Sequence, residues 1–195
     1  MLFRGHYMKQ AKTLDERELK VVLGICATRR YAARDRAIVL FSFYAGLRAK
    51  ELAALCIGNV VGEVGNVRDE CVLTPCQTKG DKARRIFINT RLQRELSVYI
   101  KSLGDTLPSQ PLFQTQKRTA FTANSMCHLF IDIYSEAGIE GASSHSGRRS
   151  LLTSLASKGV GVRVLQEIAG HSSISVTQRY IDVNDHQMRS ALEMV

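Results

Sequence analysis

The segment from His145 to Tyr180 limits what this chain can be more than any other part of it. It reads HSGRRSLLTSLASKGVGVRVLQEIAGHSSISVTQRY, with histidines, paired arginines and a tyrosine on short helical runs joined by glycine turns. His145 and Arg148 are three residues apart, so on a helix they share a face and can bind one phosphate oxygen. Tyr180 ends a polar run, SVTQRY, with too few apolar positions for an obvious core residue. Because a phenol is a poor nucleophile until cations stabilise its phenolate, the segment predicts chemistry on a phosphate.

The charge balance indicates a polyanionic partner. The 195 residues include 27 Lys and Arg against 18 Asp and Glu, which gives a formal net charge of +9 and a sequence pI near 9.6. Such an excess makes the free protein repel itself, so nucleic acid is the first candidate, although a basic surface without this role also fits the composition. A hydrophobic content of 45% over this length predicts one compact domain with a proper core.

Several other protein classes are disfavoured by the sequence. The cysteines are odd in number and scattered, without a CxxC pair or a histidine at ligand spacing, so we interpret them as reduced thiols of a cytoplasmic protein. No run approaches the roughly 18 apolar residues of a membrane span, and the N-terminus lacks the apolar run of a signal peptide. Carboxylates are not clustered at metal-ligand spacing, so we expect neither a metal nor another cofactor, and a metal nuclease is disfavoured.

Apolar periodicity and turn residues predict a mainly helical chain with a small antiparallel sheet, an α+β fold. Thr13 is expected to cap the first helix, with Glu16 completing a capping box. Valines, isoleucines and turn residues from position 57 to 89 predict the sheet, with a hairpin turn at Lys79-Gly80-Asp81-Lys82. Residues 104–119 are expected to form a long surface connection. Helices are predicted at residues 13–27, 31–45, 48–55, 92–103, 123–137, 146–157, 162–168, 173–180 and 185–194.

These elements, in this order, resemble the catalytic domain of tyrosine recombinases of the phage integrase type. The resemblance rests on AGLRAKEL, TKGDK, HSGR and AGHSSISVTQRY, and it spans roughly Thr13 to Tyr180. It implies the fold of that domain and an enzyme that cleaves and rejoins duplex DNA at specific sites through a 3'-phosphotyrosyl intermediate. The residues that it implies for catalysis are Arg48, Lys79, His145, Arg148, His171 and Tyr180.

The resemblance implies a distinct role for each of these residues. Arg48 and Arg148 are expected to bind the non-bridging oxygens of the phosphate, where the transition state concentrates negative charge. Tyr180 is expected to attack the phosphorus, so that the bond energy is retained and the strands can be rejoined without a nucleotide. For each residue an ordinary structural role stays open at this point: an exposed arginine near a helix start, or a half-buried tyrosine.

Proton transfer and orientation fall to the remaining residues. Lys79, on the hairpin turn, is expected to protonate the departing sugar hydroxyl, with Lys82 as its rival. His145 and His171 are expected to hydrogen-bond the phosphate or relay a proton, while purely structural histidines remain the alternative. Glu51 is expected to orient His145 or Arg48 without touching DNA.

Basic residues outside this set are expected to bind the DNA backbone, in a groove along the hairpin and the long connection. These residues are Lys82, Arg84, Arg85, Lys117 and Arg118, together with Arg149 beside the catalytic Arg148. Two alternatives share part of this pattern. A type IB topoisomerase resembles the chain less well around Arg48 and His171, and a DNA-binding regulator should have lost one of the six catalytic residues.

The resemblance also predicts the domain organisation. We expect an N-terminal extension at residues 1–12, the catalytic domain at 13–184 and a C-terminal helix at 185–195, without the N-terminal core-binding domain of typical members. The chain is then either a fragment or similar to the short inverting recombinases. We expect a nucleoid-associated enzyme that is a monomer when free and a tetramer on DNA.

Two further details complete the prediction. Met188, Leu192 and Val195 form one apolar stripe, which fits either a neighbouring protomer or the chain's own core. The family's H-x-x-R element commonly has leucine in its third position, where this chain has Gly147, a variation we expect to be tolerated.

Overall fold

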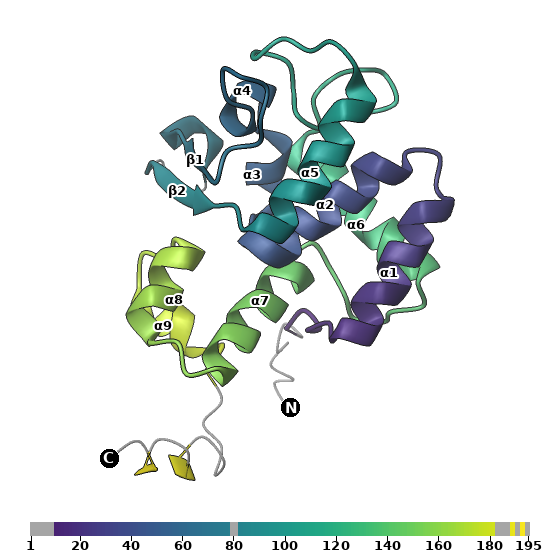
Figure 1. Cartoon of the computed structure of the whole chain (residues 1–195). Coiled ribbons are helices and arrows are strands. Elements are labelled where there is room, and N and C mark those ends of the chain that lie inside the picture. The colour runs from purple at the N-terminus through teal and green to yellow at the C-terminus, as the bar shows by residue number, and fades with distance from the viewer. Residues whose placement is uncertain (1–9, 79–81, 182–187, 190–191, 194–195) are drawn as a thin grey trace, which may run out of the picture.

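The computed structural model describes residues 10–78, 82–181, 188–189 and 192–193, and in them the chain is mainly helical with a two-stranded antiparallel sheet (Figure 1). The predicted fold class is therefore confirmed. The helices predicted between residues 31 and 180 are found with ends shifted by at most two residues. The elements are α1 (Glu16–Thr28), α2 (Ala32–Ala45), α3 (Ala49–Ala53), α4 (Ile57–Val60), β1 (Glu70–Leu73), the 3-10 turn η1 (Pro75–Gln77), β2 (Arg84–Phe87), α5 (Thr90–Leu103), α6 (Ala123–Glu136), α7 (Ser146–Ser157), α8 (Val162–Ala169) and α9 (Ile174–Gln178).

Helix α2 is the centre of the core. Its residues from Ala37 to Ser42 are all buried, as expected of a helix that is apolar on every side. It packs against α1, α5 and α7, which lie around it in Figure 1. Gly46 ends the helix in the left-handed conformation, and Arg48 then caps the start of α3. The central helix therefore places Arg48 directly beyond its own buried end.

The cap of α1 differs from the prediction. Asp15 is the capping residue: its carboxylate accepts from the backbone N–H of Glu18 at 2.7 Å, and the Glu18 carboxylate accepts from the N–H of Asp15 at 3.1 Å. The predicted box of Thr13 and Glu16 is wrong because Leu14 is buried and donates its N–H to the Ser150 hydroxyl of α7. That contact keeps the preceding residues outside the helix.

The sheet is smaller than predicted. Strands β1 and β2 pair antiparallel with Leu73 opposite Arg84, but the segment IGNVVGEVGNV begins with the helical turn α4. Asn59 explains this difference, since its side chain accepts from the N–H of Cys56 and so caps a helical turn. A single bridge, Val61 with Val67, follows. Residues 79–81 of the hairpin turn predicted at 79–82 lie outside the described residues.

Alternation along β2 decides which arginine is buried. Arg84 and Ile86 face the interior, whereas Arg85 and Phe87 are exposed. In Figure 1, β2 lies beside α8, so the inward face of this strand meets the segment that precedes His171.

Helix α7 carries the H-x-x-R element and packs closely on α2. A Cβ atom at Gly147 would lie 2.7 Å from the Ser42 hydroxyl and 3.1 Å from the backbone nitrogen of Phe43. The glycine therefore allows α7 to approach the central helix, and a leucine at this position requires the two helices to lie farther apart.

The predicted C-terminal helix at residues 185–194 lies mostly outside the described residues. Within it, Met188 and Leu192 have exposed side chains. In the described part of the chain, none of the helices has the length and apolar character needed to span a membrane. The same described residues contain no group of three or more His, Cys, Asp or Glu side chains arranged to hold a metal ion.

Candidate active site

Three arginines from three elements converge on the C-terminal end of α8. Arg84 of β2 donates to the carbonyl oxygen of Ile168, Arg148 of α7 to that of Ala169, and Arg48 to that of Gly170 at 3.3 Å. The last carbonyls of a helix lack intrahelical partners and carry the negative end of its dipole. The end of α8 therefore collects three cations on three consecutive carbonyl groups.

The Glu51 carboxylate is shared by two of these arginines. Its Oε1 accepts from Arg48 at 2.8 Å, and its Oε2 accepts from Arg84 and from the backbone N–H of Arg48, both at 2.8 Å. The side chain is fully buried, and burial by itself would raise the pKa of Glu51. Arg84, the Arg48 N–H and guanidinium, and Arg148 outweigh that effect and hold the pKa below its ordinary value. Glu51 is therefore ionised and hydrogen-bonds Arg48, one of its two predicted partners, and its role in orienting that residue stays a prediction.

Arg148 is a buried cation with a deficit of negative neighbours. The residue is 3% exposed and donates to the Gly46 carbonyl at 2.6 Å as well as to Ala169. Burial, followed by repulsion from Arg48 and Arg84, lowers the pKa of Arg148 to about 9. The group stays charged at neutral pH, and among the described residues Glu51 is the carboxylate that pairs with this trio. The site therefore holds excess positive charge, which suits an anion.

Gly170 makes this convergence possible. Its φ angle of +57° is in the left-handed region that favours glycine, and a Cβ there would lie 2.7 Å from Cδ of Arg84. The glycine before His171 therefore ends α8 and leaves room for the buried arginine.

His171 is held from both its backbone and its ring. Its N–H donates to the Gln166 carbonyl at 3.1 Å, and its own carbonyl accepts from the Gln166 side-chain amide at 3.0 Å. Its Nδ1 lies 2.9 Å from the hydroxyl of the buried Thr177. Burial, then Arg148, Arg48 and Arg84, lower the pKa of His171 to about 4, so the imidazole is neutral at pH 7.

Tyr180 follows α9 directly and stacks on His171. The two ring centroids are 5.7 Å apart with an interplanar angle of 17°. The Arg149 guanidinium lies over the Tyr180 ring, 6.0 Å from its centroid. The Tyr180 ring therefore has a neutral imidazole and a cation as neighbours, and its phenol is close enough to Arg148 to interact with it electrostatically.

Comparison with known proteins agrees with this geometry. The sequence description of the phage integrase family matches residues 12–187. The chain belongs to this family. It is 31% identical over 185 residues to the tyrosine recombinase XerA of Pyrococcus furiosus, a match covering 93% of this chain and 61% of that protein.

Solved structures of family members have the same fold. The crystal structure of XerA recombinase has a TM-score of 0.74 at 25% identity, over 94% of this chain and 65% of that one. The XerH site-specific recombinase bound to palindromic difH substrate has a TM-score of 0.69 at 23% identity, over 92% of this chain and 51% of that one. The chain thus spans between half and two thirds of these proteins.

Of the remaining predicted catalytic residues, the structure describes His145 but not Lys79. His145 caps α7 one turn before Arg148, and its side chain is exposed. Lys79 lies outside the described residues. Lys82, its rival, is exposed, and its carbonyl accepts from the Thr78 hydroxyl at the base of the same turn. The Lys50 ammonium donates to the Thr78 carbonyl at 2.7 Å, just before the same turn.

The prediction that Arg84 lines the basic DNA-binding groove needs correction. The Arg84 side chain is 7% exposed, pairs with Glu51 and donates to the Ile168 carbonyl, so it lies inside the site with Arg48 and Arg148 and not on the exposed face of β2 that carries Arg85. Its neighbour Arg85 is 62% exposed, with Glu70 at 3.7 Å, and remains a candidate for DNA binding together with Lys82. Reading the strand alternation from Ile86 and Ile88, both buried, would have shown that Arg84 faces inward.

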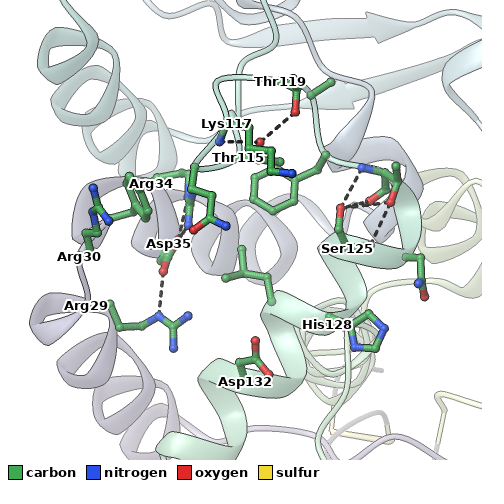
Figure 2. A pocket seen from close by; sticks show the side chains of 17 residues that line it. Arg29, Arg30, Arg34, Asp35, Thr115, Lys117, Thr119, Ser125, His128 and Asp132 are labelled. Atoms are coloured by element: carbon green, nitrogen blue, oxygen red, sulfur yellow. Dashed lines mark hydrogen bonds and ion pairs between the residues drawn. The ribbon is translucent and has the colours of Figure 1, made fainter.

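Lys117 and Arg118 do not lie beside the hairpin. Lys117 lines a separate cavity of about 740 Å³ at the N-terminal end of α2, with Arg30, Arg34 and His128 (Figure 2). The 14 residues of α2 make it about 21 Å long, and the three arginines lie beyond its other end. The predicted groove is therefore two separate basic regions and not one. DNA binding by either region stays a prediction.

Sequence reasoning missed the supporting residues Thr177, Gln166 and Lys50. Each is a polar side chain whose role depends on a contact across a turn or between elements. Thr177 carried a usable signal, because it lies six residues after His171 and three before Tyr180 on the predicted helix.

Proposed function

We propose that this chain cleaves and rejoins duplex DNA at specific sites, with Tyr180 forming a covalent 3'-phosphotyrosyl intermediate. The observation that carries the proposal is the meeting of Arg48, Arg148, His171 and Tyr180 in one site with excess positive charge. The similarity to the tyrosine recombinase XerA of Pyrococcus furiosus and to the DNA-bound XerH site-specific recombinase supports it. They do not favour the topoisomerase or regulator alternatives.

The proposed step is an in-line displacement at phosphorus. The Tyr180 phenol loses its proton to water, its oxygen forms a bond to phosphorus as the bond to the 5'-oxygen breaks, and the departing oxygen takes up a proton. Arg48 and Arg148 bind the non-bridging oxygens, which gain charge in the transition state. Each uses Nη1 and Nη2 once for a protein acceptor, and every Nη carries a second N–H that can reach the phosphate. The phosphodiester energy stays in the tyrosyl bond, so rejoining needs no nucleotide.

His171 acts as a neutral hydrogen-bond donor in this proposal. A neutral imidazole carries one ring proton, and the Thr177 hydroxyl can donate to Nδ1. The proton is then on Nε2, from which it is donated to a phosphate oxygen. In this proposal His145 is a further phosphate ligand beside His171. Lys79 is the acid that protonates the leaving oxygen.

The assembly follows from the single site per chain. Exchanging two duplexes requires four cut strands, so we propose a tetramer on DNA, with residues 185–195 docking on a neighbouring protomer. The exposed side chains of Met188 and Leu192 support this docking. Deleting residues 186–195 should then leave binding to a single site nearly intact and abolish recombination. Activity in the nucleoid follows from the DNA substrate.

The test uses nicked duplexes that trap covalent protein. A pool with randomised bases around the nick is incubated with the whole chain, and adducts are resolved on a denaturing gel. The parent and Tyr31→Phe, a tyrosine at the far end of α2, should form an adduct, and Tyr180→Phe should form none. An adduct with Tyr180→Phe, or none with the parent, would overturn the proposal.

A further inference from the structure

Arg84 is a buried charge outside the predicted catalytic set. It donates from Nη1 to Glu51 of α3 at 2.8 Å and from Nη2 to the Ile168 carbonyl of α8. It therefore joins the hairpin strand β2 to both elements that hold the proposed phosphate ligands. Its Nε is also buried and has no hydrogen-bond partner in the described structure.

Simple packing does not account for an arginine at this position. The same strand face continues with Ile86 and Ile88, both buried in the core, so an apolar side chain would suit the local environment. A buried ion pair is often no more stabilising than apolar residues of similar volume, because both charges lose their hydration. Burial and the nearby Arg48 lower the pKa of Arg84, against the effect of Glu51, so the charge is held there at a cost.

Arg84 changes the environment of Arg48 through Glu51. If Glu51 paired with Arg48 alone, the carboxylate would neutralise the guanidinium that is needed for phosphate. With Arg84 on Oε2, the carboxylate fixes the direction of Arg48 and its charge is shared between two cations. Arg48 is thus oriented while the site keeps its excess positive charge.

Arg84 also holds the start of the segment that carries His171 and Tyr180. Its bond to Ile168 lies two residues before Gly170 and three before His171, and the Arg84 side chain packs against Gly170. Loss of this bond would free the end of α8 from the sheet while Arg148 and Arg48 still hold its next two carbonyls.

We propose that Arg84 is a positioning residue for DNA cleavage: it contacts no DNA and holds Arg48 and His171 in their reactive places through Glu51 and the end of α8. This inference rests on the proposed function.

The chain offers a matched control, because Arg85 is the next residue and points to the opposite face of β2. Arg84→Gln, Arg84→Lys and Arg85→Gln are compared in the whole chain, on a nicked duplex selected by the parent from the randomised pool. Two quantities are measured for each variant: the dissociation constant on an intact copy of that duplex, and the single-turnover rate of adduct formation at saturating DNA.

Arg84→Gln should lower the adduct rate about 10-fold to 100-fold and change the dissociation constant less than about 3-fold. Arg84→Lys keeps the charge but cannot bridge two acceptors, so its rate should lie between those of Arg84→Gln and the parent. Arg85→Gln, at a candidate DNA-binding residue, should weaken binding more than Arg84→Gln does and lower the saturated rate less than Arg84→Gln does. If Arg84→Gln weakens binding and keeps its rate, Arg84 is a DNA contact and the inference is wrong.

A measurement without DNA separates this inference from the proposed function and from a folding defect. The ring protons of His171 are titrated by NMR in the parent, in Arg84→Lys and in Arg84→Gln. Arg84→Gln should raise the pKa of His171 and shift its ring resonances, with Arg84→Lys closer to the parent. If the parent forms no adduct, the proposed function fails, and unchanged His171 resonances in folded Arg84→Gln or Arg84→Lys would independently refute the positioning role.

Discussion

The two ends of α2 carry similar residues but differ in charge balance. At the N-terminal end, the Asp35 carboxylate, 1% exposed, pairs with Arg29 at 2.8 Å and Arg34 at 2.7 Å (Figure 2). Arg29 also pairs with Glu136. Two arginines there share two carboxylates. At the C-terminal end, three arginines share Glu51 and otherwise bind backbone carbonyls.

The difference appears in the arginine pKa values. Burial would lower the pKa of Arg29, but the hydrogen bonds with Glu136 and Asp35 raise it above its ordinary value. The pKa of Arg148 is instead lowered to about 9 by burial and by its two cationic neighbours. The cluster of Arg29, Arg34, Asp35 and Glu136 is balanced in charge, whereas the arginines at the other end of the helix gain from an added anion. Arginine–carboxylate pairing by itself therefore does not mark a reactive site, and the charge imbalance does.

The strongest test of this comparison replaces one arginine at each end by methionine. Arg148→Met should slow adduct formation by about 10²-fold or more, because a non-bridging oxygen loses its ligand. Its effect on the free energy of unfolding should be within about 1 kcal/mol, since relief of repulsion offsets the lost bonds to Gly46 and Ala169. Arg48→Ala should slow cleavage similarly.

Arg34→Met should give the reverse result. It breaks a buried pair and leaves Asp35 with Arg29 alone, so unfolding should become easier by about 3 kcal/mol. The adduct rate of the folded protein should not change. Single-turnover assays and urea unfolding measure the two quantities, and a rate loss in Arg34→Met equal to that of Arg148→Met would contradict the comparison.

A smaller effect is expected at the histidine support. Thr177→Val keeps the shape of the side chain and removes the partner of His171 Nδ1, so the adduct rate should fall about 10-fold at unchanged DNA affinity. Thr115→Val, which removes a hydroxyl bonded to Thr119 on the other side of the protein, is the control and should keep the parent's rate. Equal adduct rates for the two variants would show that Thr177 does not support His171 in the reaction.

Much of this arrangement could be predicted from the sequence, because it depends on local patterns. The ends of α2 and α7 follow from apolar runs and glycines, and Arg48, Glu51 and Arg148 share spacings that place them near helix starts. The family resemblance predicts in addition that these residues lie close together. The charge imbalance was not predictable, since it depends on which strand face meets the end of α8.

The errors have the same origin. Arg84 and Arg85 are adjacent and chemically identical, and the alternation along β2, with Ile86 buried on the same face, turns Arg84 inward. Lys117 follows the hairpin in the chain but lies at the other end of α2, because α5 and the long connection lead away from the sheet. Sequence proximity and shared charge therefore do not establish a common surface.

Salt dependence tests whether both basic regions meet DNA. With about four phosphates neutralised by the chain, the slope of log affinity against log salt should be roughly −4. Joint replacement of Lys117 and Arg118 by glutamine should make the slope less steep by about 2 if the region at the N-terminal end of α2 touches DNA, and leave the saturated adduct rate unchanged. Gel shifts at several salt concentrations measure this, and an unchanged slope would confine DNA binding to the catalytic end.

The smallest expected effect is a pH dependence of stability at the catalytic end. The pKa of His171 is about 4 in the folded chain and near 6.5 when unfolded, so between these values the unfolded state binds more protons. The stability that this group contributes is complete above pH 6.5 and is lost as the pH falls toward 4. Because the side chain is only half-buried, the change should be about 1 kcal/mol or less. Urea unfolding at pH 7 and pH 5 should show His171→Gln losing less stability on acidification than the parent. Parallel behaviour of the two proteins would mean that the three arginines do not repel a charged His171, and the charge imbalance would then be smaller than their contacts indicate.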